Sequence, residues 1–178
     1  MTDINRDGDG SKPPSSPLDV ARSYIARGWN PVPVPFKAKK PVGDAWQKRT
    51  ITLQNVERYF NTGPQNIGVQ LGPKSGGLAD VDLDSREAID LAPYFLPDTP
   101  AVFGRTSKPR SHHLYKLDGV PDKAEIQHRD PDGEMIVELR IGGGNKGAQT
   151  VFPGSTHESE ELERIPLDLN RGFPPRFD

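Results

Sequence analysis

The chain has 178 residues, a formal net charge of −2 and no cysteine. This length suits one domain, and the lack of cysteine excludes disulfides and thiolate zinc sites. The charge argues against a protein that coats nucleic acid through bulk positive charge, and no apolar run approaches the roughly 20 residues of a membrane span. Together with 37 Gly and Pro residues, these features predict a soluble intracellular domain of mixed helix and strand with many turns.

The N-terminal half begins with a polar segment, residues 1–15, which we expect to be a disordered tail. Ser16 and Pro17 then favour the start of a helix that Gly28 ends. Alternating Val and Pro over residues 30–36 predicts an edge strand. A second helix is expected to be capped by Thr52 and to end at Gly63-Pro64.

The following segments alternate short strands with turns. Strands are expected at 66–71 and 78–83, separated by a Gly-rich turn. Asp84 is expected to cap a third helix, with Glu87 at the capping-box position. Further strand candidates cover 101–106, 113–117, 134–140 and 149–152, and after Thr156 the chain becomes acidic and Pro-rich. We therefore divide the chain into a tail, a folded domain over 16–160 and a C-terminal extension or linker over 161–178.

Asp80 and Asp82 stand out within the expected strand at 78–83. Alternation places both carboxylates on one face of the strand, where they repel each other unless a cation lies between them. Carboxylate oxygens are ligands that suit Mg²⁺ or Mn²⁺. The alternative is a polar strand end that leads into a capped helix.

A second polar cluster contains Ser111, His112 and His113, with Lys108 and Arg110 in the turn before it. If this segment is a strand, Leu114 enters the core while His113 points to the opposite, active face. Histidine, lysine and arginine can donate hydrogen bonds to phosphate oxygens. The alternative is ordinary surface turn chemistry.

A third acidic residue, Glu138, lies inside the apolar strand candidate at 134–140. Its burial requires a partner, either a metal or an arginine. Arg140 shares its face in a strand, so a simple surface ion pair is the alternative. The glycines at 142–144 allow a close backbone approach or form a plain hairpin loop.

In order and setting, these features resemble the bifunctional primase-polymerase domains of phage, plasmid and bacterial replication proteins, within the archaeo-eukaryotic primase superfamily. The family has an acid-x-acid strand, a Ser-x-His strand and a later acid, which Asp80-Val81-Asp82, Ser111-His112-His113 and Glu138 resemble. The likeness covers roughly 18–157 and includes flanking landmarks at Tyr24–Trp29, Lys40-Pro41, Trp46, Asn66–Val69, Leu96–Pro100 and Pro153–His157. The third acid is more often aspartate, and the turn before the histidine is usually Gly-rich; here it is Ser107–Arg110.

The resemblance implies an α+β fold, in which an α/β N-terminal module joins a sheet like that of the RNA-recognition motif. It also implies a nucleotidyltransferase, a DNA polymerase or primase, in which Asp80, Asp82 and Glu138 hold two Mg²⁺ or Mn²⁺ ions. The nucleotide-binding residues would be Lys108, Arg110, Ser111, His113 and Arg140, and the Leu-Tyr pair after His113 favours it over His112.

The partners implied are a DNA template and primer, dNTP or NTP, and a helicase or helical primase domain in the same or another chain, in the cytoplasm of a bacterial or phage-infected cell. Two other classes remain, of which only the first uses the same carboxylates. A metal-dependent nuclease would shorten DNA without nucleotides, and a non-catalytic replication-initiation module would bind single-stranded DNA without metal.

Overall fold

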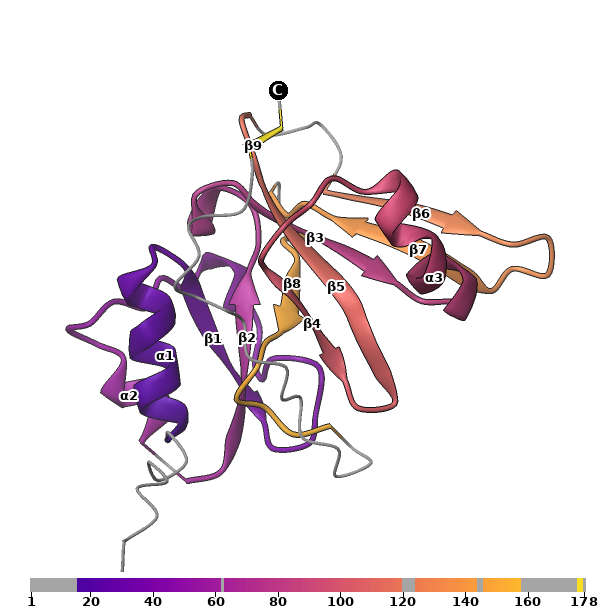
Figure 1. Cartoon of the computed structure of the whole chain (residues 1–178). Helices are drawn as coiled ribbons and strands as arrows, with labels where there is room; N and C mark the ends of the chain where they lie inside the picture. Colours follow the sequence, from indigo (N-terminus) through magenta and orange to yellow (C-terminus); the bar gives the residue numbers. More distant parts are fainter. Residues whose placement is uncertain (1–15, 62, 120–123, 144–145, 158–175, 178) are drawn as a thin grey trace, which may run out of the picture.

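The computed structural model describes residues 16–61, 63–119, 124–143, 146–157 and 176–177. The expected tail at 1–15 and all but two residues of the extension at 161–178 lie outside these ranges. The described part is a mixed α/β fold built on two antiparallel sheets (Figure 1). None of its helices is long and apolar enough to cross a membrane.

The first sheet has the strand order β1-β2-β8, with β1 (Asn30–Pro35) at an edge, β2 (Gln65–Gln70) in the centre and β8 (Gln149–Val151) at the other edge. Helices α1 (Pro17–Ala26) and α2 (Glu57–Phe60) lie beside it (Figure 1). As predicted, Ser16 caps α1, accepting a hydrogen bond from the Asp19 backbone N–H at 3.1 Å. The Tyr24 hydroxyl, donating to the Pro153 carbonyl at 2.7 Å, ties α1 to the chain after β8.

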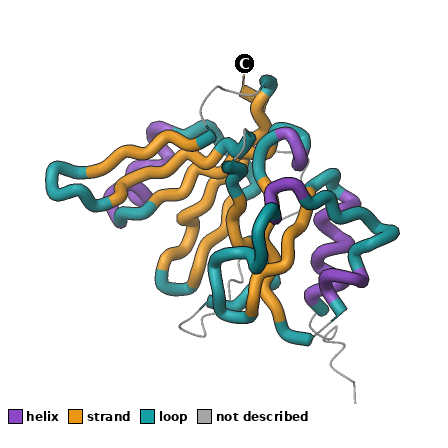
Figure 2. The backbone as a smooth tube through the Cα atoms, turned by 180° about the vertical axis from the view of Figure 1, so that it is seen from behind, coloured by secondary structure: helices purple, strands orange, loops and turns teal. Residues whose placement is uncertain are grey.

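The second sheet has the order β4-β5-β3-β7-β6, and β9 (Arg176–Phe177) adds to β5 in parallel. Its other strands are β3 (Leu78–Leu83), β4 (Val102–Arg105), β5 (Lys108–Leu117), β6 (Glu125–Arg129) and β7 (Met135–Arg140). Helix α3 (Arg86–Phe95) follows β3, and the short 3₁₀ turns η1 (Trp46–Lys48) and η2 (Pro73–Ser75) lie in loops. Viewed from behind, the strands of both sheets gather in the middle, with α1 and α3 at opposite sides (Figure 2).

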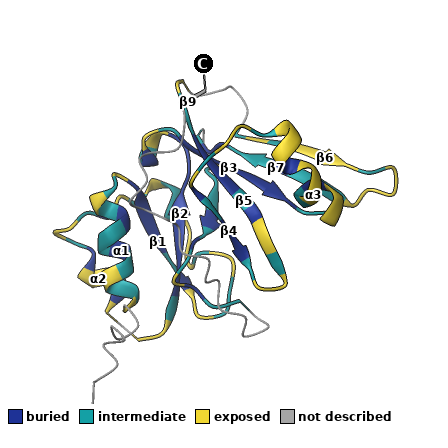
Figure 3. Ribbon diagram, in the orientation of Figure 1, coloured by how far each residue is buried: buried dark blue, intermediate teal, exposed yellow. Residues whose placement is uncertain are grey.

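Two apolar clusters hold these layers together. The larger joins α1, both sheets and the β8 region, and includes Phe103, Leu114 and Phe152, each with 0% exposure. The smaller lies between the second sheet and α3 and includes Val81 and Tyr115. The central strands are buried and the outer side of α3 is exposed (Figure 3). The two faces of β3 therefore contact different clusters, so the surroundings of each polar residue depend on the face on which it lies.

Four expectations about elements need correction. The helix expected from Thr52 starts later and has only four residues, because 53–56 form turns. The cap of α3 is Ser85, whose side chain accepts from the Ala88 N–H at 3.1 Å, and not Asp84. Strand β5 begins at Lys108, five residues earlier than expected. Strand β6 was not expected, because its exposed sequence Glu-Ile-Gln-His-Arg has no apolar alternation.

Candidate active site

Two rows of side chains cross the second sheet on the same face. Antiparallel pairing aligns Asp82 of β3 with Glu138 of β7 on one side and with His112 of β5 on the other. In the next row, Asp80 is opposite Arg140 of β7. Directly paired residues share a face, so three carboxylates, one histidine and one arginine converge there.

Asp80 is the most deeply placed acid of the site, with 0% exposure. Its Oδ2 lies 3.0 Å from His112 Nδ1 and accepts a 2.6 Å hydrogen bond from the Thr150 hydroxyl, which belongs to β8 of the other sheet. Burial alone would raise the pKa of Asp80, but His112, Arg140 and the Thr150 hydroxyl outweigh it and hold the pKa below its usual value. Asp80 is therefore an ionised anchor between the two sheets.

Asp82 behaves differently although it lies on the same strand face. Burial raises the pKa of Asp82, and the charges of Asp80 and Asp84 act in the same direction against the opposing effect of His112 and Arg140. The two carboxylates thus have pKa values displaced in opposite directions, as expected when like charges share one site. An added cation would stabilise the charged form of both.

Arg140 provides the positive charge of the site. Its Nη2 lies 2.7 Å from Asp82 Oδ2, its Nε 2.5 Å from Glu138 Oε2 and its Nη1 4.0 Å from Asp80 Oδ2. Burial would lower the pKa of Arg140, but the three carboxylates raise it. The second oxygen of Glu138 accepts a 2.9 Å hydrogen bond from Gln127. The Glu138–Arg140 ion pair, which the sequence offered as the alternative to a metal ligand, is present, but Glu138 is buried and the pair extends to Asp82.

The expectation that His113 faces the carboxylates is wrong. His113 pairs with Val81 on the opposite face of the sheet, whereas His112 pairs with Asp82 and stacks on the Phe103 ring with centroids 4.6 Å apart. The carboxylate face continues into the main core, so Leu114 and His112 share it. Burial lowers the pKa of His113 to about 4, and its Nδ1 has no hydrogen-bond partner among the described residues.

A cavity of about 350 Å³ opens over this face. Among the residues predicted from sequence, Asp82, Lys108, Ser111 and Arg140 line it. The buried Asp80, His113 and Glu138 and the exposed Arg110 do not. Lys108 Nζ lies 2.7 Å from Asp84 Oδ1. His112, which the sequence offered as the less favoured of two histidines, also lines the cavity. Cavity residues that the sequence did not single out for the site are Ala38, Lys39, Lys40, Asn66, Asp84, Arg105, Gln149, Thr150, Val151, Thr156 and His157.

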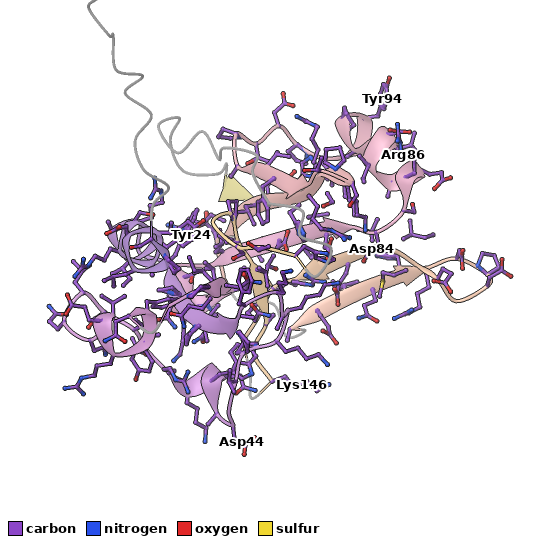
Figure 4. The ribbon with its side chains drawn as sticks, turned by 90° about the horizontal axis from the view of Figure 1, so that it is seen from below. Tyr24, Asp44, Asp84, Arg86, Tyr94 and Lys146 are labelled. Carbon is purple, nitrogen blue, oxygen red and sulfur yellow. The ribbon has the colours of Figure 1, made fainter. Side chains whose placement is uncertain are left out.

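These additional residues come from loops and strands distant in sequence. Lys39 and Lys40 follow β1. Arg105 ends β4, and its Nη1 lies 3.2 Å from His157 Nε2. The two lysines belong to a basic run that the sequence displays, but no local pattern places it opposite β3. Seen from below, the labelled Arg86 and Tyr94 project from α3 on the far side of the sheet from Lys146 (Figure 4).

The chemistry of the donors decides whether a divalent cation fits. Among the described residues, no three His, Asp or Glu side chains have the spacing of a metal-binding cluster. Three carboxylates on one face nevertheless offer the oxygen ligands that Mg²⁺ and Mn²⁺ prefer, and their charge already attracts one partly buried cation, Arg140. The donor set fits a hard cation, provided that Arg140 gives up its contacts.

Comparison with known proteins gives one match and one negative result. A search among curated proteins found no similar sequence. The family model described as the N-terminal domain of bifunctional DNA primase/polymerase matches residues 21–169. This range contains every residue of the two polar rows, including Asp80, Asp82 and Glu138. The chain therefore belongs to the bifunctional DNA primase/polymerase family, which implies nucleotidyltransferase activity in general terms.

Proposed function

We propose that this chain catalyses template-directed nucleotidyl transfer, adding nucleotides to a primer annealed to a DNA template. The observation that carries this proposal is the composition of the cavity. Asp82 and Asp84 line it together with Lys39, Lys40 and Lys108. A triphosphate that enters with divalent cations needs acidic oxygens for the cations and basic side chains for the phosphates.

The metal-binding role falls to Asp80, Asp82 and Glu138, which share one face of the sheet. When bound, two Mg²⁺ or Mn²⁺ ions would activate the primer 3′-hydroxyl and neutralise the triphosphate and the leaving pyrophosphate. The chain itself orients the carboxylates. The Thr150 hydroxyl and His112 hold Asp80, and the Gln127 amide holds Glu138, so the carboxylates are oriented before any ligand arrives.

We assign phosphate contacts to Lys108, Ser111 and His112, all of which line the cavity. His112 replaces His113 in this role, because its ring lies on the carboxylate face. Arg110, expected from sequence to bind the nucleotide, does not line the cavity and is left without a role. Arg140 bonds directly to Asp82 and Glu138, which favours a role at the metal site rather than in nucleotide binding.

The proposal also covers the fold and the biological context of the domain. We infer that the sheet β4-β5-β3-β7-β6, with α3 on one side, is the RNA-recognition-motif-like half of the domain. The expected partners are a template, a primer and dNTP or NTP. A helicase or helical primase domain, in this or another chain, would supply priming functions in the replication of a phage, plasmid or other mobile element.

One gel tests the proposal. The purified chain is incubated with a labelled primer on a longer DNA template, with Mg²⁺ or Mn²⁺, with and without dNTPs and with and without EDTA. Extension that requires both dNTPs and metal supports the proposal. Metal-dependent shortening without dNTPs would establish the nuclease instead, and binding of the template that EDTA does not change, without any extension, would establish a binding module.

A further inference from the structure

We propose that Arg140 is a two-position counterion: it holds the carboxylates in the metal-free protein and moves to Glu125 when a divalent cation binds. The inference rests on the metal role proposed for Asp82 and Glu138. The first observation is that the Arg140 guanidinium lies within 4.0 Å of one oxygen of each of the three carboxylates. The second observation is that an exposed carboxylate, Glu125, lies on the other side of the same arginine.

The first position is the one in the structure. The guanidinium bonds to Asp82 Oδ2 at 2.7 Å and to Glu138 Oε2 at 2.5 Å, while its side chain keeps 26% exposure. A buried trio of carboxylates without a positive partner would be strongly destabilised by desolvation and mutual repulsion. Arg140 and a divalent cation therefore compete for the same oxygens, because neither carboxylate oxygen can serve both at full strength.

The second position follows from the register of β6. Glu125 is the direct partner of Arg140 across the β6–β7 pair, just as Asp80 is its partner across the β3–β7 pair. Side chains in such pairs have Cβ atoms about 4.5–5.5 Å apart, well within the reach of an arginine. Glu125 is exposed. An arginine released from Asp82 thus meets another carboxylate by a change of side-chain rotamer alone.

The cavities provide the space for this movement. Arg140 lines the cavity over the carboxylates and also an adjoining cavity of about 360 Å³. Glu125 lines only the second of these, together with Trp46, Lys40 and Gly147. The guanidinium stands at the boundary between two solvent-accessible spaces, so the change does not require the core to open.

The two positions predict opposite effects of two substitutions on metal affinity. Arg140→Gln removes the competitor, and Mn²⁺ should bind more tightly by roughly tenfold or more, the usual worth of a charge-assisted hydrogen bond. Glu125→Gln removes the second partner, which favours the first position, and Mn²⁺ should bind several-fold more weakly. In the double variant Glu125→Gln should have no further effect, because the arginine that it receives is absent.

The experiment measures Mn²⁺ binding to the full chain without nucleotide, by electron paramagnetic resonance of free Mn²⁺. Arg86→Gln is the control, since it also removes one arginine charge but pairs with Asp90 on α3 and not with the trio. This control should change the Mn²⁺ affinity by less than about threefold. If Arg140→Gln does not fold, Arg140→Lys keeps the charge but loses the two-pronged contact and should bind Mn²⁺ more tightly than the wild type.

Three results would overturn the inference. Unchanged or weaker Mn²⁺ binding by a folded Arg140 variant would show that the arginine does not compete. An Arg140→Gln gain combined with no effect of Glu125→Gln would leave a fixed counterion and no second position. In both cases the wild type still binds Mn²⁺, so the proposed function stands. Absence of Mn²⁺ binding by the wild type and by Arg140→Gln would remove the metal site and the inference together.

Discussion

The hydrogen bond from Thr150 to Asp80 joins the two sheets, and its loss has an effect on stability that can be calculated. Thr150 has 2% exposure, Asp80 has 0%, and the two oxygens are 2.6 Å apart. Hydrogen bonds to charged groups contribute about 1.5–3 kcal/mol, and replacing the hydroxyl by a methyl group leaves the buried carboxylate short of one donor. Thr150→Val should therefore lower the free energy of unfolding by about 1.5–3 kcal/mol at pH 7.

The pH dependence of this loss identifies its cause. The pKa of Asp80 is lowered in the folded protein, so the stability it contributes is present above the unfolded pKa and is lost as pH falls through the folded pKa. Removing the Thr150 donor raises that folded pKa. The difference between Thr150→Val and the wild type should be largest near neutral pH and should shrink once the variant's carboxyl becomes protonated.

Urea unfolding followed by circular dichroism measures both quantities, and thermal unfolding should show a decrease of roughly 3–12 °C in Tm. Thr150→Ser is the matched control, because it keeps the hydroxyl and should recover most of the stability. If Thr150→Val is as stable as the wild type, the hydrogen bond does not stabilise the fold. If Thr150→Ser and Thr150→Val are equally destabilised at neutral pH, the hydroxyl is not the cause of the loss.

Three other predictions concern the cavity and the buried histidine. His112→Ala should weaken dNTP binding roughly tenfold in a calorimetric titration, the worth of one hydrogen bond to a charged group, while His113→Leu should leave it unchanged; the reverse pattern would restore His113 to the site. Because burial lowers the pKa of His113 to about 4, the free energy of unfolding of the wild type should fall by roughly 2–3 kcal/mol as pH falls from 6.5 to 4. Urea unfolding of His113→Leu should not show this decrease. Joint replacement of Lys39 and Lys40 by alanine should weaken dNTP binding severalfold at low salt and less at high salt, whereas an unchanged titration would exclude them from phosphate contact.

The parts of the site that could be predicted from sequence are those that depend on one strand. Alternation within β3 places Asp80 and Asp82 on one face, whatever their partners are. Glu138 is recognisable because a charged residue interrupts an apolar strand. The start of α1 is equally local, since Ser16, Pro17 and Asp19 contain the whole capping signal.

The parts that could not be predicted depend on how strands pair. A shift of one residue between β3 and β5 exchanges the faces of His112 and His113, and no local feature sets that register. Thr150 reaches Asp80 only because two separate sheets meet. Glu125 lies in a strand whose exposed residues carry no apolar pattern, so neither the strand nor the pairing of Glu125 with Arg140 could be predicted.

We propose that the carboxylates on β3 and β7 support metal-dependent addition of nucleotides to a primer. Single-nucleotide incorporation on a primed template, compared among the wild type, Asp82→Asn and Asp90→Asn, tests it most directly. Asp90 is an exposed acid on α3, beyond the sheet from the site, and controls for the loss of one charge. We expect Mn²⁺-dependent incorporation by the wild type and Asp90→Asn, and a loss of at least about a hundredfold in folded Asp82→Asn. Equal incorporation by Asp82→Asn and the wild type would contradict it.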